Sequence, residues 1–367
     1  MRHTPYTEAG FDSCTRDRME AVFRIFRKWS LLIVTLTTLA ILLAGCSDSS
    51  ESGREGPAGA AESGPNEWRL LPQFPPREQV ISRRLLGLND LFKLDDNTAW
   101  VVGTDGAIGR TIDGGETFAL QKSGTAINLA AVWFADNSNG WVVGTAGTVL
   151  KTADGGDNWQ ILQAVPGVFA LESVYFEDAQ NGWTVADSGG IYKTADGGAS
   201  WTKLDSGTRE DLLDVSFLSD GSGAWAVGYE GAVVHSADGG ETWSVQNSGT
   251  DAVLNSVWFA SETFGIAVGE KGTVIRTTNG GSTWESVESG QTEDLFGVFF
   301  LDDSNGWAVG ARNLVVHSTD GGTSWTMEET TSSGDSLKGI MFTNVNSGLA
   351  AGSGGRIWKF GPRSLDN

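Results

Sequence analysis

The chain has 367 residues, including 50 Gly and 15 Trp, and a formal net charge of −21. An acidic chain is repelled by nucleic acid and by anionic lipid headgroups, so we expect neither as a direct partner. The two cysteines are Cys14 and Cys46. Because both lie near the N-terminus, the remainder of the chain has no disulfide framework, thiol nucleophile or thiol ligand.

Residues 1–45 are predicted to be a signal peptide of the lipoprotein type. A basic segment beginning at Arg24 precedes an apolar stretch that ends in small residues, which is typical of secretory signals. The string LAGC, which ends at Cys46, resembles the lipobox of bacterial lipoproteins, and this resemblance implies cleavage before Cys46 and lipidation of its thiol. Met19 is an alternative start of the chain. An uncleaved membrane anchor is the alternative to cleavage.

Residues 46–66 are predicted to be a flexible tether, because they are mostly Ser, Gly, Glu and Pro and have little to bury. Removal of residues 1–45, which hold six Lys or Arg and four Asp or Glu, changes the formal charge from −21 to −23. We expect an exported protein, lipid-anchored to a bacterial membrane and facing the periplasm, or the thylakoid lumen in a cyanobacterium.

Residues 67–362 contain a repeat with a period of 41 or 42 residues. Each unit has short alternating apolar runs separated by Gly, Asn and Asp turns, which predicts four antiparallel strands per unit. A repeat of four-stranded units predicts an all-β propeller. The seven predicted blades begin near Leu88, Ile127, Phe169, Asp211, Ala252, Asp294 and Asp335.

The seventh unit stops before its fourth strand, and the missing strand is predicted at the other end of the chain. The string GPNEWRLLP from Gly64 matches GGDNWQILQ from Gly155, which places Trp68 where Trp159 stands. An N-terminal strand that completes the last blade closes the ring and removes its exposed edges.

Six units carry an Asp box, [Ser/Thr]-x-Asp-x-Gly-x-[Thr/Ser]-Trp, in the predicted turn between the third and fourth strands. We expect its carboxylate to accept hydrogen bonds within the turn and its Trp to cover the core between blades. Asn279 and Phe118 depart from the pattern. The box positions, all predicted to be structural, are Asp113, Asp154, Asp196, Asp238, Asn279 and Asp320.

Asp boxes also occur in sialidases and other glycoside hydrolases, so a carbohydrate-active or carbohydrate-binding propeller is the alternative function. Sialidases need a Tyr nucleophile and an Arg cluster. After the leader the tyrosines are Tyr175, Tyr192 and Tyr229, and other acidic residues, such as Asp302 and Asp303, lie mainly in predicted turns. We predict no catalytic residue, no metal site and no cofactor.

A basic or potentially basic residue precedes each box Asp by three positions, and the unit without a box supplies one more. Either each cation pairs with a nearby carboxylate and ties blades together, or unpaired members form a basic patch for an acidic or helical segment of a partner. Arg110 and Arg276 are the strongest candidates, because a guanidinium makes bidentate carboxylate contacts. The seven residues, here named the basic ring, are Arg110, Lys151, Lys193, His235, Arg276, His317 and Lys359.

The lipobox-like leader, the seven units, the NGWxVG strings and the xTxDGGxTW strings together resemble the photosystem II stability and assembly factor family. The resemblance covers residues 67–362. It implies a non-enzymatic propeller that holds a newly made reaction-centre subunit on the lumenal side of a membrane during assembly. We expect the protein to be a monomer. The implied partner is a membrane protein or an assembly intermediate, and a photosystem II subunit where the host is photosynthetic.

Overall fold

The computed structural model describes residues 65–75, 87–328 and 334–362. The predicted signal peptide, Cys46 and nearly all of the tether lie outside these residues. None of the helices among the described residues has the length and apolar character needed to span a bilayer. The first strand, β1 (Asn66–Leu70), begins at a residue that the sequence analysis assigned to the tether.

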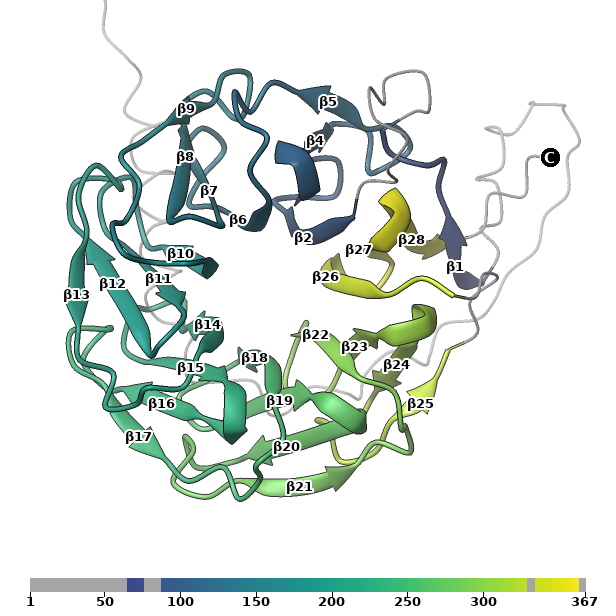
Figure 1. Cartoon of the computed structure of the whole chain (residues 1–367). Helices are drawn as coiled ribbons and strands as arrows, with labels where there is room; N and C mark the ends of the chain where they lie inside the picture. The colour runs from purple at the N-terminus through teal and green to yellow at the C-terminus, as the bar shows by residue number, and fades with distance from the viewer. Residues whose placement is uncertain (1–64, 76–86, 329–333, 363–367) are drawn as a thin grey trace, which may run out of the picture. The chain divides into compact units, whose positions relative to one another are not determined.

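The described chain forms seven four-stranded antiparallel sheets arranged as the blades of a ring (Figure 1). Blade 1 consists of β2 (Leu88–Lys93), β3 (Ala99–Gly103), β4 (Ile108–Thr111) and β5 (Ala119–Gln121). Blade 2 consists of β6 (Leu129–Phe134), β7 (Gly140–Gly144), β8 (Thr148–Thr152) and β9 (Gln160–Ile161). Blade 3 consists of β10 (Leu171–Phe176), β11 (Gly182–Ala186), β12 (Gly190–Thr194) and β13 (Thr202–Leu204).

The remaining blades repeat this arrangement. Blade 4 consists of β14 (Leu212–Phe217), β15 (Ala224–Gly228), β16 (Val233–Ser236) and β17 (Ser244–Gln246). Blade 5 consists of β18 (Leu254–Phe259), β19 (Gly265–Gly269), β20 (Thr273–Thr277) and β21 (Glu285–Glu288). Blade 6 consists of β22 (Leu295–Phe300), β23 (Gly306–Gly310), β24 (Val315–Ser318) and β25 (Thr326–Met327). Blade 7 consists of β26 (Leu337–Asn344), β27 (Ser347–Gly352), β28 (Arg356–Pro362) and β1.

The N-terminal strand closes the ring as predicted. Strand β1 pairs antiparallel with β28, so that Trp68 stands opposite Phe360 (Figure 1). The Trp68 side chain is 5% exposed and packs against Phe342 and Phe360 at centroid distances of 5.8 and 5.2 Å. The predicted seven-bladed, all-β propeller is therefore confirmed, and its ends are joined by hydrogen bonds between strands from opposite ends of the chain.

A stack of two aromatic rings joins most neighbouring blades. The last residue of an inner strand is usually Phe, and this ring lies over a Gly on the second strand of its own blade while it packs on a Trp of the preceding blade. Phe134, for example, stands opposite Gly140, where a Cβ would come within 2.5 Å of the Phe134 ring. The same ring stacks on Trp100 at 3.6 Å. The Gly of the NGW string is required because the Phe occupies the space of its side chain.

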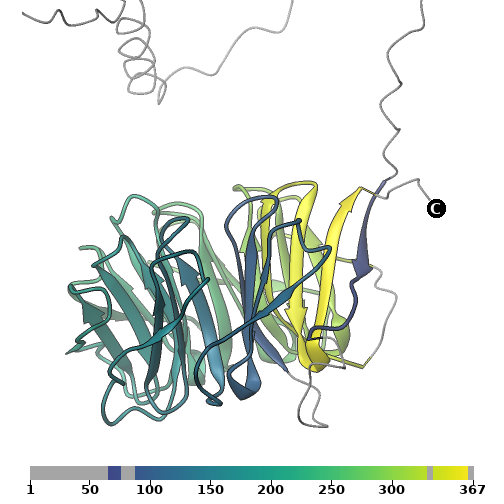
Figure 2. The ribbon, with the colours of Figure 1, turned by 90° about the horizontal axis from the view of Figure 1, so that it is seen from above.

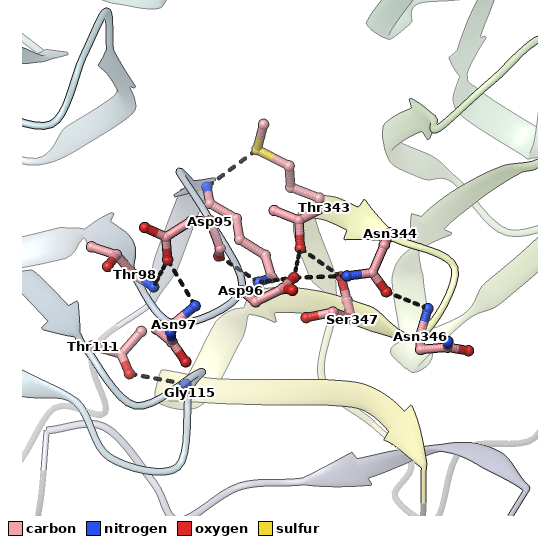
Figure 3. Close-up of polar contacts among 12 residues, drawn as sticks. Asp95, Asp96, Asn97, Thr98, Thr111, Gly115, Thr343, Asn344, Asn346 and Ser347 are labelled. Atoms are coloured by element: carbon pink, nitrogen blue, oxygen red, sulfur yellow. Dashed lines mark hydrogen bonds and ion pairs between the residues drawn. The ribbon is translucent and has the colours of Figure 1, made fainter. Parts of the chain in front are cut away.

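The contact between blade 7 and blade 1 is built differently. Leu349 stands where five of the other six blades have Trp and blade 5 has Ile266, and Lys93 stands where the other blades have Phe. Lys93 is 3% exposed, its Nζ donates to the Asp95 carbonyl at 2.7 Å, and its backbone N–H contacts Met341 Sδ at 3.2 Å. Figure 3 shows Asp96 facing Thr343 and Asn344 of β26, and Asn344 Nδ2 donates to Asp96 Oδ1 at 2.8 Å. A polar network thus replaces the aromatic stack where the ring closes.

The loops gather on two opposite rims, because all strands run between the same two rims (Figure 2). One rim carries the turns between the first and second strands and those between the third and fourth strands of each blade. Since the Asp boxes lie in the latter turns, we name this the box-bearing rim. The opposite rim carries the turns between the second and third strands, including η3 (Tyr229–Gly231).

Candidate functional site

Each Asp box forms a closed hydrogen-bonded turn. In blade 3, Asp196 Oδ1 accepts from the Thr194 hydroxyl and the Ser200 N–H, both at 2.8 Å, and its Oδ2 accepts from the Ser200 hydroxyl at 2.6 Å. Such donors stabilise the ionised carboxylate. In blade 4, the Thr242 hydroxyl and N–H are the main cause that lowers the pKa of Asp238 to about 2. The oxygens of these carboxylates are therefore occupied by hydrogen bonds within their own turns.

The two departures from the box pattern fit the same geometry. Asn279 Oδ1 accepts from the Thr283 N–H at 2.9 Å, and its Nδ2 donates to the Thr283 hydroxyl at 2.9 Å, so an amide replaces the carboxylate by reversing one hydrogen bond. Phe118 stands at the Trp position of blade 1 and packs against Phe74 at 6.0 Å. The turn therefore needs an acceptor and an aromatic ring more than it needs a charge.

The structure places the basic ring one residue per blade, on the third strands near the box-bearing rim. In five blades the side chain lies over a ring of the second strand, as Arg110 does over Trp100 at 5.4 Å. His235 stacks on Trp225 at 4.6 Å, and burial lowers its pKa, so it is uncharged near neutral pH. The seven side chains are spread around the ring rather than brought together.

Three ring members pair with a carboxylate in the Asp box of the next blade. Arg110 Nη1 lies 2.7 Å from Asp157 Oδ1, and Lys359 Nζ lies 2.7 Å from Glu116 Oε1. Lys193 pairs with Glu241. All three acids stand at the same box position, directly after the two Gly residues. His317 instead lies 3.3 Å from Glu328.

The other three members have no carboxylate within ion-pair distance among the described residues. The same box position is Ala199, Ser282 and Thr323 in the blades that follow them. Lys151 Nζ donates to the Ala179 carbonyl at 3.3 Å, and Arg276 Nε donates to the Gly321 carbonyl at 2.7 Å. Arg110, one of the two strongest candidates for a partner contact, is thus tied to the next blade. Binding of a partner by the ring stays a prediction, and it applies to Lys151 and Arg276.

The central channel holds charged residues that the sequence analysis did not identify. A cavity of about 230 Å³ is lined by the seven inner strands and contains Asp90, Glu172, Asp214 and Lys338. Asp214 accepts from the Ser173 and Ser256 hydroxyls, both at 2.9 Å, and from the Val257 N–H at 3.0 Å. It therefore links blades 3, 4 and 5.

Burial raises the pKa of the channel carboxyls. Burial raises the pKa of Asp90 to about 7, against its ordinary value of 3.8, although the Val132 N–H donates to Asp90 Oδ2 at 2.9 Å. The pKa of Asp214 is also raised by burial. Asp90 and Asp214 accept hydrogen bonds from neighbouring blades. Tyr175 also lines the channel, and it is 9% exposed. Among the described residues no group of three or more His, Cys, Asp or Glu side chains could hold a metal ion.

A family comparison identifies the repeats. The model described as "Photosynthesis system II assembly factor YCF48" matches residues 122–209, 155–247, 200–291 and 243–336, which together cover more than half of the chain. The chain belongs to this family. A search of curated protein sequences gives no match.

Solved propellers of the YCF48 family have the same fold. A structure titled "YCF48 bound to D1 peptide" is 20% identical, with a TM-score of 0.66 over 82% of this chain and 96% of that chain. YCF48 from Cyanidioschyzon merolae is 22% identical, with a TM-score of 0.64 over 80% and 99% of the two chains. A streptogramin B lyase, 12% identical, reaches a TM-score of 0.65 over 81% and 98%. Because an enzyme shares the fold, function has to be argued from the site.

The pairing between blades predicts the effect of adding the carboxylate that blade 3 lacks. Ala199→Glu should give Lys151 a partner like that of Lys193, and should raise the free energy of unfolding by about 0.2–1 kcal/mol, as for partly exposed ion pairs. Urea unfolding measures the change. In a Lys151→Met background the same substitution should give no gain, and an equal gain there would contradict the pairing.

The raised pKa of Asp90 predicts that the contribution of this residue to stability falls as the pH rises from about 4 to about 7. The folded protein keeps the Asp90 proton over this range and the unfolded chain releases it, so ionisation favours unfolding. Asp90→Asn should therefore have a higher Tm than wild type at pH 8, and the difference should shrink towards pH 4. Asp251→Asn, an exposed control, should show no such trend. A constant difference at all pH values would contradict the assignment.

Proposed function

We propose that this chain is a non-enzymatic binding protein that holds a membrane protein subunit while a complex is assembled. The observation that carries the proposal is its membership of the YCF48 family, whose model is described as an assembly factor. The similar structure with a bound D1 peptide supports a protein segment as the ligand. Where the host is photosynthetic, we propose a photosystem II subunit as the partner.

The carboxylates of the Asp boxes and Asp214 support a binding function over hydrolysis. The box carboxylates are committed to their turns, and Asp214 is committed to contacts between blades. A glycosidase needs two carboxyl groups that face a scissile bond. The box carboxylates and Asp214 are therefore not available for hydrolysis, and the family match favours the assembly role over the carbohydrate-active alternative.

We further propose that lipidation of Cys46 anchors the propeller to the outside of the membrane from which the partner emerges. The lipobox-like string and the predicted tether support this proposal. An anchor confines the propeller to the membrane surface, where the local concentration of membrane partners is high. The acidic propeller itself gives no electrostatic attraction to anionic lipid.

Affinity capture tests the proposed function. The tagged protein, isolated from detergent-solubilised membranes of its own host, should carry one or more subunits of a membrane complex in substoichiometric amount. Mass spectrometry identifies them, and the D1 subunit is the expected one in a photosynthetic host. Capture of no complex subunit by the wild-type protein would contradict the proposal. Lys151→Ala with Arg276→Ala tests the basic ring, and capture equal to wild type would reject it.

Cys46→Ala tests the anchor. Wild-type protein should incorporate radiolabelled palmitate and sediment with membranes, whereas the variant should incorporate none and remain in the soluble exported fraction. The test is independent of a start at Met1 or Met19. Equal labelling of the two proteins would contradict lipidation at this residue.

A further inference from the structure

The box-bearing rim contains a hollow of about 900 Å³ at the mouth of the central channel. We name it the cup. Blades 2 to 6 line it with the last residues of their inner strands and with the turns that follow. Its floor includes an arc of aromatic rings, in which Trp133 lies 5.0 Å from Tyr175 and Tyr175 stacks on Phe217 at 4.3 Å.

The lining of the cup is acidic. It includes Glu177, Asp302 and Asp303, and it includes no Lys, Arg or His. Asp302 accepts hydrogen bonds from the Ser304 and Asn305 N–H groups, both at 2.8 Å, so its carboxylate is partly committed. The exposed carboxylates of Glu177 and Asp303 make no hydrogen bond or ion pair with other described residues. Two negative charges are therefore available to a ligand.

The floor adds a second attraction for cations. The faces of Trp and Tyr attract ammonium and guanidinium groups, and the alkyl stems of Lys and Arg pack on apolar surface. Trp133 and Trp258 are half-buried members of the lining. The Trp133 Nε1–H donates to the Phe176 carbonyl at 2.9 Å, and the Trp258 Nε1 atom is buried. The two indoles therefore offer a ligand their apolar ring surface rather than a hydrogen-bond donor.

We propose that the cup binds a basic segment of the partner protein, with Lys or Arg side chains that reach Glu177 and Asp303 and apolar side chains that pack on the aromatic floor. This inference rests on the proposed function and specifies the chemistry of the partner. An acidic segment is repelled here, because the lining carries three carboxylates and the whole chain has a net charge of −21. Three of the ring cations already pair with box carboxylates, and none of the seven lines the cup.

Titration calorimetry with synthetic peptides tests the cup. The probe is a short peptide in which Lys and Leu alternate, and its control has Glu in place of Lys. The wild-type protein should bind the basic peptide and not the acidic one. Glu177→Gln with Asp303→Asn should raise the Kd for the basic peptide at least tenfold.

The matched control removes two negative charges from the opposite rim. Glu230→Gln with Asp251→Asn has the same change in net charge, and both residues are exposed, so it should leave the Kd nearly unchanged. An equal loss of affinity in both double variants would mean attraction by net charge alone and would overturn the cup. A wild-type protein that binds neither peptide would overturn it as well.

Capture from host membranes with the same variants separates the cup from the proposed function. If wild type captures a complex subunit and Glu177→Gln with Asp303→Asn captures much less at unchanged Tm, the cup is supported. If both capture it equally, the cup is overturned and the proposed function stands. If wild type captures no subunit, the proposed function fails, and the peptide titration still decides whether the cup binds basic segments.

Discussion

The propeller depends on the stack of a Phe from one blade on a Trp from the blade before it. The centroid distances are 3.6 Å for Trp100 and Phe134, 3.6 Å for Trp141 and Phe176, and 3.5 Å for Trp225 and Phe259. Aromatic pairs bury a large apolar area and favour defined relative orientations. The stacked contact recurs between blades 1 and 2, 2 and 3, 4 and 5, and 6 and 7, so these pairs of blades pack in a similar way.

The exceptions show how strictly the stack constrains its surroundings. In blade 4 the residue opposite Phe217 is Ala224 rather than Gly, and the Trp183 and Phe217 rings are 4.8 Å apart and tilted by 37°. In blade 1 the Phe is replaced by Lys93, and the opposite residue is Ala99. A Cβ is therefore tolerated only where the Phe is displaced or absent. At the contact between blades 7 and 1, where the ring closes, hydrogen bonds replace the stack of Phe on Trp (Figure 3).

Much of this architecture could be predicted from the sequence because it is local and repeated. The period, the alternating strands and the match of Trp68 to Trp159 depend on residues within one unit, and they predicted the blades and the closing strand. The partner of Arg110 could not be predicted in this way, because Asp157 lies 47 residues further on, in the next blade. A repeat alignment compares equivalent positions, whereas this contact joins unlike positions of two units.

The channel carboxylates were missed for a different reason. Every described inner strand has a register shift near its start, as between Leu88 and Asp90 and between Leu212 and Asp214. A β-bulge interrupts the alternation of side chains between the two faces of a sheet. Strict alternation therefore places Asp90 and Asp214 on the wrong face of their sheets. The sequence signal was an Asp inside an apolar strand, which is costly to bury without partners. Hydrogen bonds from the neighbouring blades provide those partners.

The Asp box connects this architecture to the cup. In five blades the Gly after the box Asp donates its N–H to a carbonyl in the turn between the first and second strands, as Gly321 does to Ser304 at 3.0 Å. Ser304 directly follows Asp303, and Gly197 makes the same contact with Gln180 in the turn that begins at Glu177. The outer turns are thus rigid and hold the inner turns in place. In the inner turns, the Glu177 and Asp303 side chains make no hydrogen bond or ion pair with other described residues. They can therefore bind a ligand, while the Asp box stabilises the backbone of the turns.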